Sequence, residues 1–419
     1  MNEKYFKRNI KIVLPENVKF ILRTLRDSGF EAYAVGGCVR DSILGLAPTD
    51  WDITTSAKPL ETKTLFKRTI DTGIQHGTVT IMIKGEGYEV TTYRVDGEYV
   101  DGRHPKNILF TSNLTEDLKR RDFTINAMAY NDEHGVVDCF GGMEDLENGI
   151  IRCVGKAKER FTEDALRMLR AVRFSGVLGF DICNDTLNAI RELAPSITKI
   201  SRERIQVELD KLIMSSHPDR ITVLYDLGLM QYIFEKELKK DTDNADRVLL
   251  AKLLTIAPKN HYVRWSLFIT FVSGNDILRS LKFDNNTVRI CNQLLKYKDE
   301  FLSSTESDLR HSIVAVGKDI FGKYYMPYRM TLASYSGAAT EELKVVEAAY
   351  EAIIRRGDCL SVGELAVNGN DIRDLGISEG RQIGYILNEL FELVLTDCSK
   401  NNREYLLKRS IELSVLNNR

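Results

Sequence analysis

Two aspartates, Asp50 and Asp52, are the first candidates for chemistry, because one residue separates them in the segment 50–55, DWDITT. If this segment is a β-strand, residues two apart share a face and both carboxylates point the same way. Two like charges side by side are costly unless a cation lies between them. Paired carboxylates are typical ligands of Mg²⁺, which also binds substrate phosphates. A solvated strand edge would give the same pattern, so the neighbouring residues must decide.

A pair of glycines precedes the aspartates. Gly36 and Gly37 follow the apolar run EAYAV, and we expect a short helix over residues 38–44, ended by Gly45. Glycines at a strand-to-helix turn let the backbone approach a ligand, and the first N–H groups of a helix attract an anion. Arg40 can add a bidentate contact to the same phosphate. By itself, the pair is also typical of an ordinary turn.

Further charged residues follow along the chain. Glu89, in the strand-like run YEVTTYR, is a candidate third carboxylate for the same metal. The segment LKRRDFTINAMAY contains Arg120 and Arg121, with Asn126 about one helical turn later. Arginines at this density in a cleft require anions, and a nucleoside triphosphate would supply them.

The segment EDALRMLRAVRF carries four charged residues at steps of three, which we expect on one stripe of a helix: Asp164, Arg167, Arg170 and Arg173. A solvated row of salt bridges is the ordinary explanation for such a stripe. It fits poorly here, because three apolar residues run alongside and would bury part of it: Leu166, Leu169 and Val172.

The elements that must position these residues are of two kinds. From about residue 30 to 155, short runs rich in Val, Ile, Thr and Tyr alternate with turns, and helical patterns flank them, including one over LTEDLKRRDFTINAMAY. From about residue 157 onward the apolar residues recur with the period of a helix. We therefore predict an α+β protein, with a small mixed sheet followed by a long all-helical part.

Composition limits the functional classes. A chain of 419 residues is expected to form two to four domains, and its net charge of −2 argues against a uniformly basic coat for nucleic acid. The seven cysteines are odd in number and contain no C-x-x-C pair, which indicates reduced thiols. The N-terminus has no signal-like apolar run, and WSLFITFV is too short to cross a bilayer. A cytoplasmic protein without a membrane partner is expected.

Seven motifs occur together and in order over roughly residues 30 to 212, among them GGCVRDSILG…TDWDITT, EDLKRRDFTINAMAY, FTEDALRMLRAVRFSGVLGF and ISRERIQVEL. With these motifs the chain resembles the class II, bacterial-type tRNA nucleotidyltransferases, within the superfamily that also includes bacterial poly(A) polymerases. The resemblance implies a nucleotidyltransferase head (1–150), followed by an all-α neck (151–215), body (216–310) and tail (311–419).

The resemblance also implies an activity: addition of CCA to the 3′ end of tRNA from CTP and ATP, with release of pyrophosphate and no stable protein partner. Asp50 and Asp52 would hold two Mg²⁺ ions, and Glu89 would support them. The turn at Gly36 and Gly37, together with Arg40, Arg121 and Asn126, would bind the nucleotide. Asp164 and Arg167 would read its base, and Arg170 and Arg173 would support them.

Several alternatives stay open at the level of sequence. A D-x-D glycosyltransferase would not need the arginine sets, and a non-catalytic RNA-binding module would not need Asp50 and Asp52. A poly(A) polymerase shares the head and neck motifs, but usually carries a strongly basic C-terminal extension, unlike SIELSVLNNR. Within the family, a complete loop at 94–110 favours full CCA addition over CC addition, while addition of A alone stays open.

Overall fold

The computed structural model of the chain describes residues 6–7, 10–97, 108–235, 244–272, 276–335, 337–377 and 380–416. It forms two compact units. The first consists of Met1–Leu238 with Ser280–Lys282, and the second of Lys239–Arg279 with Phe283–Arg419. The first unit contains the predicted head and neck, while the four finer domain boundaries stay predictions.

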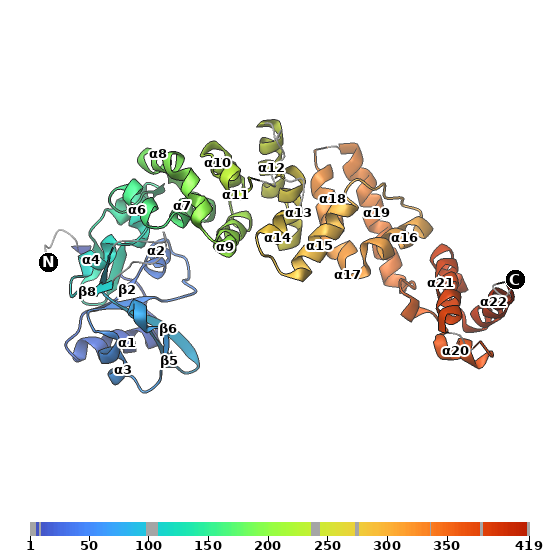
Figure 1. Ribbon diagram of the computed structural model, residues 1–419, viewed down its shortest axis with the longest axis horizontal. Coiled ribbons are helices and arrows are strands. Elements are labelled where there is room, and N and C mark those ends of the chain that lie inside the picture. Colours follow the sequence, from blue (N-terminus) through green and yellow to red (C-terminus); the bar gives the residue numbers. More distant parts are fainter. Residues whose placement is uncertain are drawn as a thin grey trace. The chain divides into compact units, whose positions relative to one another are not determined.

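The first unit is built on an eight-stranded sheet with the order β1-β10-β9-β2-β3-β6-β5-β4 (Figure 1). The strands are β1 (Phe6–Lys7), β2 (Ala32–Val35), β3 (Ile53–Thr55), β4 (Thr69–Gly73), β5 (Thr78–Ile83), β6 (Glu86–Thr92), β9 (Met128–Asn131) and β10 (Gly135–Asp138). β3 and β6 pair in parallel, and the other neighbours pair antiparallel. The predicted mixed sheet is thus confirmed.

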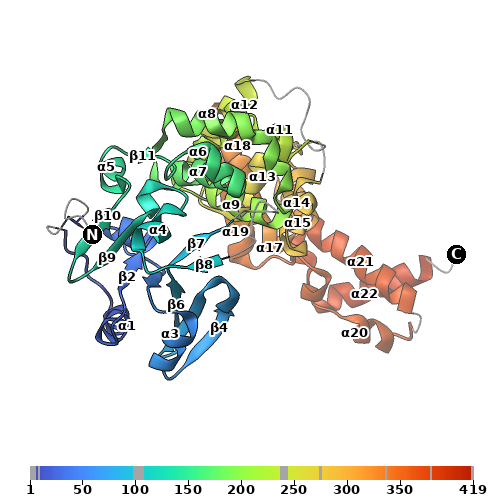
Figure 2. The same cartoon turned by 60° about the vertical axis from the view of Figure 1, so that its left-hand side comes forward.

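Helices cover this sheet and connect its strands; they are α1 (Glu16–Asp27), α2 (Gly37–Ile43), α3 (Pro59–Leu65), α4 (Leu114–Lys119) and α5 (Gly142–Glu147). α1 and α3 lie side by side next to the sheet, as Figure 2 shows. α1 buries Val18, Ile21, Leu22 and Leu25, whose spacing of three, one and three residues places them on one face. The predicted helix after Gly37 is confirmed as α2.

The loop predicted over 94–110 is described only at its two ends. β7 (Arg94–Asp96) pairs antiparallel with β8 (Ile108–Phe110). Residues 98–107, which make up most of the predicted loop, lie outside the described residues.

Two expectations about local structure were wrong. The strand expected from Asp50 begins only at Ile53, so both aspartates lie in the loop that leads into β3. The helix expected over residues 114–130 ends at Lys119, and the chain becomes extended as Phe123 bridges to Cys153. The last part of this segment is β9. It pairs with both β10 and β2, so its backbone groups form the hydrogen bonds of the sheet, which they could not do in a helix.

Four helices follow the sheet within the first unit: α6 (Ala157–Glu163), α7 (Leu166–Leu178), α8 (Asn184–Leu193) and α9 (Arg202–Ile213). α7 buries Leu166, Leu169 and Val172, as the sequence predicts. Asp164, however, precedes α7 and ends α6, so the four charged residues do not share one helix. A short parallel pair, β11 (Ile150–Ile151) with β12 (Asp181–Ile182), links this region to α7. The unit continues with α10 (Ile221–Asp226) and α11 (Leu229–Ile233).

The second unit is helical wherever it is described, which confirms the predicted change of texture. Its longer helices are α12 (Asn244–Ile256), α13 (His261–Val272), α15 (Asn285–Lys296), α16 (Glu306–Val316), α18 (Met326–Ala333), α19 (Gly337–Arg356), α21 (Gly380–Thr396) and α22 (Arg403–Leu416). Among the described residues, no helix has both the length and the apolar character required to cross a membrane.

Candidate active site

The two aspartates lie where the chain enters the centre of the sheet. The carbonyl oxygen of Asp52 accepts a hydrogen bond of 2.9 Å from the N–H of Val35, the residue that ends β2 just before Gly36. Both side chains are exposed, and neither carboxylate forms an ion pair with any described residue. Partial desolvation nevertheless raises the pKa of Asp52; Arg121 opposes this shift and Asp50 adds to it. The site therefore holds two neighbouring acids that form no ion pair with the described residues.

Glu89 lies on the neighbouring parallel strand. Ile53 pairs with Val90, so the register carries Asp52 to the level of Glu89, with both side chains on the same face. Within the described part of the chain, however, no three Asp, Glu, His or Cys side chains gather closely enough to hold a metal ion. The donor set that fits a metal is the pair Asp50 and Asp52, and a role for Glu89 stays a prediction.

Arg121 approaches this pair across the glycine turn. Gly36 has a φ of +82°, and a Cβ atom there would lie 2.9 Å from Nη1 of Arg121, so only glycine leaves room for the guanidinium. The nearest carboxylate of an ion pair is Asp117, at 3.8 Å. The Nε of Arg121 is buried without a hydrogen-bond partner. Burial lowers the pKa of Arg121, in line with the long distance to Asp117 and the unpartnered Nε. Such a cation is suited to a phosphate.

Arg40, which the sequence assigned to phosphate binding, is already occupied. Its guanidinium donates to Asp41 at 2.8 Å and to the side-chain oxygen of Asn126 at 2.6 Å. Asn126 in turn donates to Asp122 at 3.1 Å. Gly37 is the first residue of α2, the helix that carries Arg40. Arg40 and Asn126 therefore bind each other and protein acceptors, and a phosphate-binding role for Arg121 stays a prediction.

Asp164 and Arg167, the predicted base-reading pair, lie close together but bind other residues. The carboxylate of Asp164 accepts from the N–H of Leu166 at 3.0 Å and from Arg204 at 2.7 Å. Arg167 donates to Glu163 at 2.6 Å and to the carbonyl oxygen of Arg120 at 3.0 Å. The second bond ties the start of α7 to the C-terminal end of α4, the helix that precedes Arg121.

Arg170 and Arg173 extend this network along α7. Arg170 donates twice to Asp122, at 2.8 and 2.6 Å, and Arg173 donates to Glu208 of α9 at 2.5 Å. Burial would raise the pKa of Asp122, but the charge of Arg170 and its hydrogen bonds hold that pKa well below its usual range. Their hydrogen bonds go to Asp122 and Glu208, so a role in supporting Asp164 and Arg167 stays a prediction.

Sequence reasoning missed three of the residues that hold the site together: Asp117, Arg204 and Glu208. Asp117 is fully buried and accepts from Thr54 at 3.0 Å and from Arg120 at 2.9 Å. Arg204 and Glu208 belong to α9 and lie in the recognised motif ISRERIQVEL, four residues apart. That spacing on one helix face was a signal that both could reach the same neighbouring helix.

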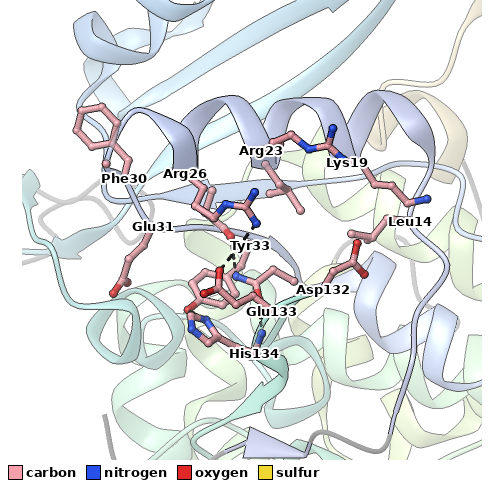
Figure 3. Close-up of a pocket in the computed structure, with 14 residues that line it drawn as sticks. Leu14, Lys19, Arg23, Arg26, Phe30, Glu31, Tyr33, Asp132, Glu133 and His134 are labelled. Atoms are coloured by element: carbon pink, nitrogen blue, oxygen red, sulfur yellow. Dashed lines mark hydrogen bonds and ion pairs between the residues drawn. The ribbon is translucent and has the colours of Figure 1, made fainter.

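A cavity of about 450 Å³ elsewhere in the first unit is not part of this site (Figure 3). It lies between α1, the turn at 131–134 and the start of β2, away from Gly36 at the end of that strand. Several of its polar groups already pair with protein groups. Tyr33 bonds to His134 at 2.7 Å, and Arg26 reaches across to Glu133 at 3.9 Å.

Comparison with known proteins places this arrangement in a family. Residues 32–152 match the model of the poly A polymerase head domain, and residues 179–241 match that of the probable RNA and SrmB-binding site of polymerase A. The chain is 38% identical to a CCA-adding enzyme of Lactiplantibacillus plantarum, over 93% of this chain and 94% of that protein. It is 36% identical to one of Leuconostoc mesenteroides, with the same two coverages.

Solved structures agree. The structure of the Bacillus stearothermophilus CCA-adding enzyme in complex with CTP is similar with a TM-score of 0.77 and 30% identity, covering 95% of this chain and 97% of that one. The Thermotoga maritima CCA-adding enzyme complexed with tRNA shares the fold, with a TM-score of 0.64 and 18% identity. Since the likeness in sequence runs nearly end to end and the fold agrees over the same length, this chain belongs to the family of CCA-adding enzymes.

Proposed function

We propose that this chain adds C, C and A in turn to the 3′ end of tRNA, using CTP and ATP and releasing pyrophosphate. The names of its full-length relatives and the CTP complex of a similar structure support the proposal. The observation that carries it is that opposite charges lie close together at the Gly36 turn. Two carboxylates that form no ion pair with described residues lie near Arg121, a partly buried cation whose Nε has no hydrogen-bond partner. A metal ion and a triphosphate are the two missing complements.

Asp50 and Asp52 would hold Mg²⁺, with the remaining ligands supplied by substrate oxygens and water. Bound there, Mg²⁺ would activate the 3′-hydroxyl of tRNA and stabilise the charge on the triphosphate. Arg121 would bind the triphosphate by charge-assisted hydrogen bonds, since its Nε has no protein acceptor to give up. Asp122 and Asn126 hold Arg170 and Arg40 in place around the nucleotide.

Asp164 and Arg167 would select the base. Cytosine and adenine each offer a ring nitrogen that accepts and an amine that donates, whereas uracil and guanine present the opposite pattern. Each carboxylate oxygen has two lone pairs, so Asp164 can accept from the base amine while keeping Arg204 and Leu166. A mismatched base would leave buried polar groups unpaired, which would cost about 1–3 kcal/mol per group.

The decisive experiment is incubation with tRNA transcripts that end before CCA, after C and after CC, with each nucleotide separately. We expect CTP to extend the first two and ATP the third. Failure of the wild-type protein to extend any transcript would refute the proposal. Extension of only the first two transcripts would assign a CC-adding enzyme, and extension of only the third would assign an A-adding enzyme.

A poly(A) polymerase is the second candidate, because the family model that matches the head bears that name. It would add runs of A to transcripts with any end, in the same experiment. A cytoplasmic location is part of the proposal, and fractionation of cells that express the tagged chain would test it.

A further inference from the structure

Phe174 of α7 is the apolar contact between that helix and the sheet-bearing part of the first unit. The ring is 5% exposed. Phe123, which lies between α4 and β9, meets it edge-on, with the ring centroids 5.7 Å apart and an interplanar angle of 80°. Arg40 of α2 lies over the same ring, 5.1 Å from its centroid. One side chain of α7 therefore contacts two segments that are far from it in sequence.

Three guanidinium groups surround this ring. Besides Arg40, Arg170 lies 5.4 Å and Arg173 3.8 Å from the centroid. Each arginine also has its own acceptors, on Asp41 and Asn126, on Asp122, and on Glu208 respectively. Burial and the neighbouring charge of Arg170 lower the pKa of Arg173, so the cluster carries an electrostatic cost. The negative face of an aromatic ring offsets such a cost, and an aliphatic side chain of similar size does not.

The position of this ring matters for the reaction. Arg167 lies in α7, and Asp164 is linked to that helix through the N–H of Leu166. The catalytic aspartates lie on the other side of the contact, just before β3. A shift of α7 against α2 would move the base-reading pair relative to the metal-binding pair, and even a small misplacement is costly in catalysis.

We propose that Phe174 is a positioning residue that holds α7 in register with α2, and that its ring thereby sets the base selectivity of nucleotide addition. The inference rests on the proposed function. Phe174 would act through the three arginines over its ring, Arg40, Arg170 and Arg173, and not as a ligand of the nucleotide or the metal. The competing explanation is that Phe174 merely fills space in the core.

Replacement of Phe174 by trifluorophenylalanine separates the two explanations, because fluorine withdraws π density from the ring and changes its shape little. The readout is single-turnover incorporation of each of the four nucleotides on tRNA lacking CCA. We expect the preference for CTP over UTP to fall by about tenfold, the factor that corresponds to one lost desolvated cation–π contact. Phe174→Leu should show the same loss, and Phe174→Tyr, which keeps the ring, should retain most of the selectivity.

Phe161 of α6 is the matched control, because it is equally aromatic and fully buried, and no described cation lies over its ring. The same substitutions there should lower the melting temperature without changing selectivity. Wild-type selectivity in the trifluoro variant at Phe174, or equal losses at both positions, would overturn the inference. An inactive wild-type protein would instead refute the proposed function.

A stability measurement, which needs no enzymatic activity, distinguishes failure of this inference from failure of the proposed function. Arg40→Met removes the cation that α2 places over the ring but keeps its aliphatic length. Arg40→Met and Phe174→Leu should each lower the melting temperature. In the double variant the loss should be smaller than the sum of the two single losses, since both changes remove the same contact. Strictly additive losses would overturn the inference whatever the activity.

Discussion

Two arginines, one in each unit, differ in how completely protein groups compensate their charge. Arg310 of α16 is 3% exposed and fully satisfied. It donates to Asp358 at 2.9 Å and to the carbonyl oxygens of Leu395 and Thr396, at the end of α21, at 2.7 and 3.2 Å. Arg121 has one carboxylate at 3.8 Å and a buried, unpartnered Nε.

The difference lies in how each charge is compensated. Arg310 joins three helices, because Asp358 follows α19 and the two carbonyl groups end α21, where a cation is favourable. Nothing in the described residues completes Arg121 in the same way. The incomplete compensation of the Arg121 charge costs stability. Proteins keep such a cost at sites where a bound ligand completes the contacts. Four predictions test this contrast.

The largest effect is expected at the acids beside Arg121. Asp50→Ala and Asp52→Ala should each lower the rate of nucleotide addition more than about a thousandfold, because either change removes a metal ligand. Stability should stay the same or rise, since the two acids repel each other and the pKa of Asp52 is raised. The measurements are single-turnover incorporation, tRNA binding by filter retention and the melting temperature. Near-wild-type incorporation by either variant would contradict the metal-binding assignment.

Arg310→Met should lower stability and leave activity unchanged, which is the opposite of the result expected for the two aspartate variants. It leaves two helix-end carbonyl groups without their donor and Asp358 with Arg356 alone, which should lower the free energy of unfolding by about 3–5 kcal/mol. The folded fraction should keep wild-type kcat and base selectivity. Urea denaturation measures the free energy of unfolding, and active-site titration allows kcat to be given for the folded fraction. A selective loss of kcat would contradict a purely structural role for Arg310.

Arg121→Met should weaken nucleotide binding with little effect on stability. Loss of its charge-assisted bonds to phosphate should raise KM for CTP and for ATP alike by about tenfold to a hundredfold. The melting temperature should not fall, because the substitution removes a buried and poorly compensated charge. A drop in stability comparable to that of Arg310→Met would identify Arg121 as a structural residue.

The smallest effect concerns pH. Burial opposes ionisation of Asp358, but Arg356 and Arg310 prevail and lower its pKa below 3.8. Its ionisation therefore stabilises the fold above that pH, and this contribution is lost as the pH falls through the folded-state pKa. Asp52 has a raised pKa, so its contribution is present below pH 3.8 and is lost as the pH rises through the folded-state value.

Asp358→Asn should accordingly lower the melting temperature at neutral pH and less so in acid. Asp52→Asn should cost nothing at neutral pH. One proton changes the stability by at most about 1.4 kcal/mol per pH unit, which calorimetry between about pH 3 and pH 7 can detect. The same pH dependence of the melting temperature in both variants would contradict the assigned directions of the two pKa shifts.

The sequence predicted the residue types of the site better than their contacts. Asp52 was selected for its spacing from Asp50, and Arg121 for its place beside Arg120 in the segment LKRRDFTINAMAY. Arg40 was assigned to phosphate, yet Asn126, which binds it, lies far along the chain. Such long-range pairs leave no periodic trace, and for the same reason Asp117 was overlooked.

Secondary structure was predictable where burial has a simple period. α7 follows the helical pattern, and the end of β6 follows the alternating strand pattern. β9 was taken as part of a helix, because its residues are buried on both faces in the middle of the sheet and do not alternate. A fully buried strand and a buried helix have the same apolar composition, and only the pairing with β2 and β10 separates them.

The strand order has a consequence for how the chain folds as it is synthesised. β2 lies between β3 and β9, so the strand that leads to the glycine turn stays an open edge until residues 128–131 have been made. The parallel pairing of β3 with β6 likewise waits for residue 92. Since long-range strand pairing is slow and exposed edges invite aggregation, the nascent chain is most vulnerable over this interval. Folding of the reactive centre can be completed only after about a third of the polypeptide has left the ribosome.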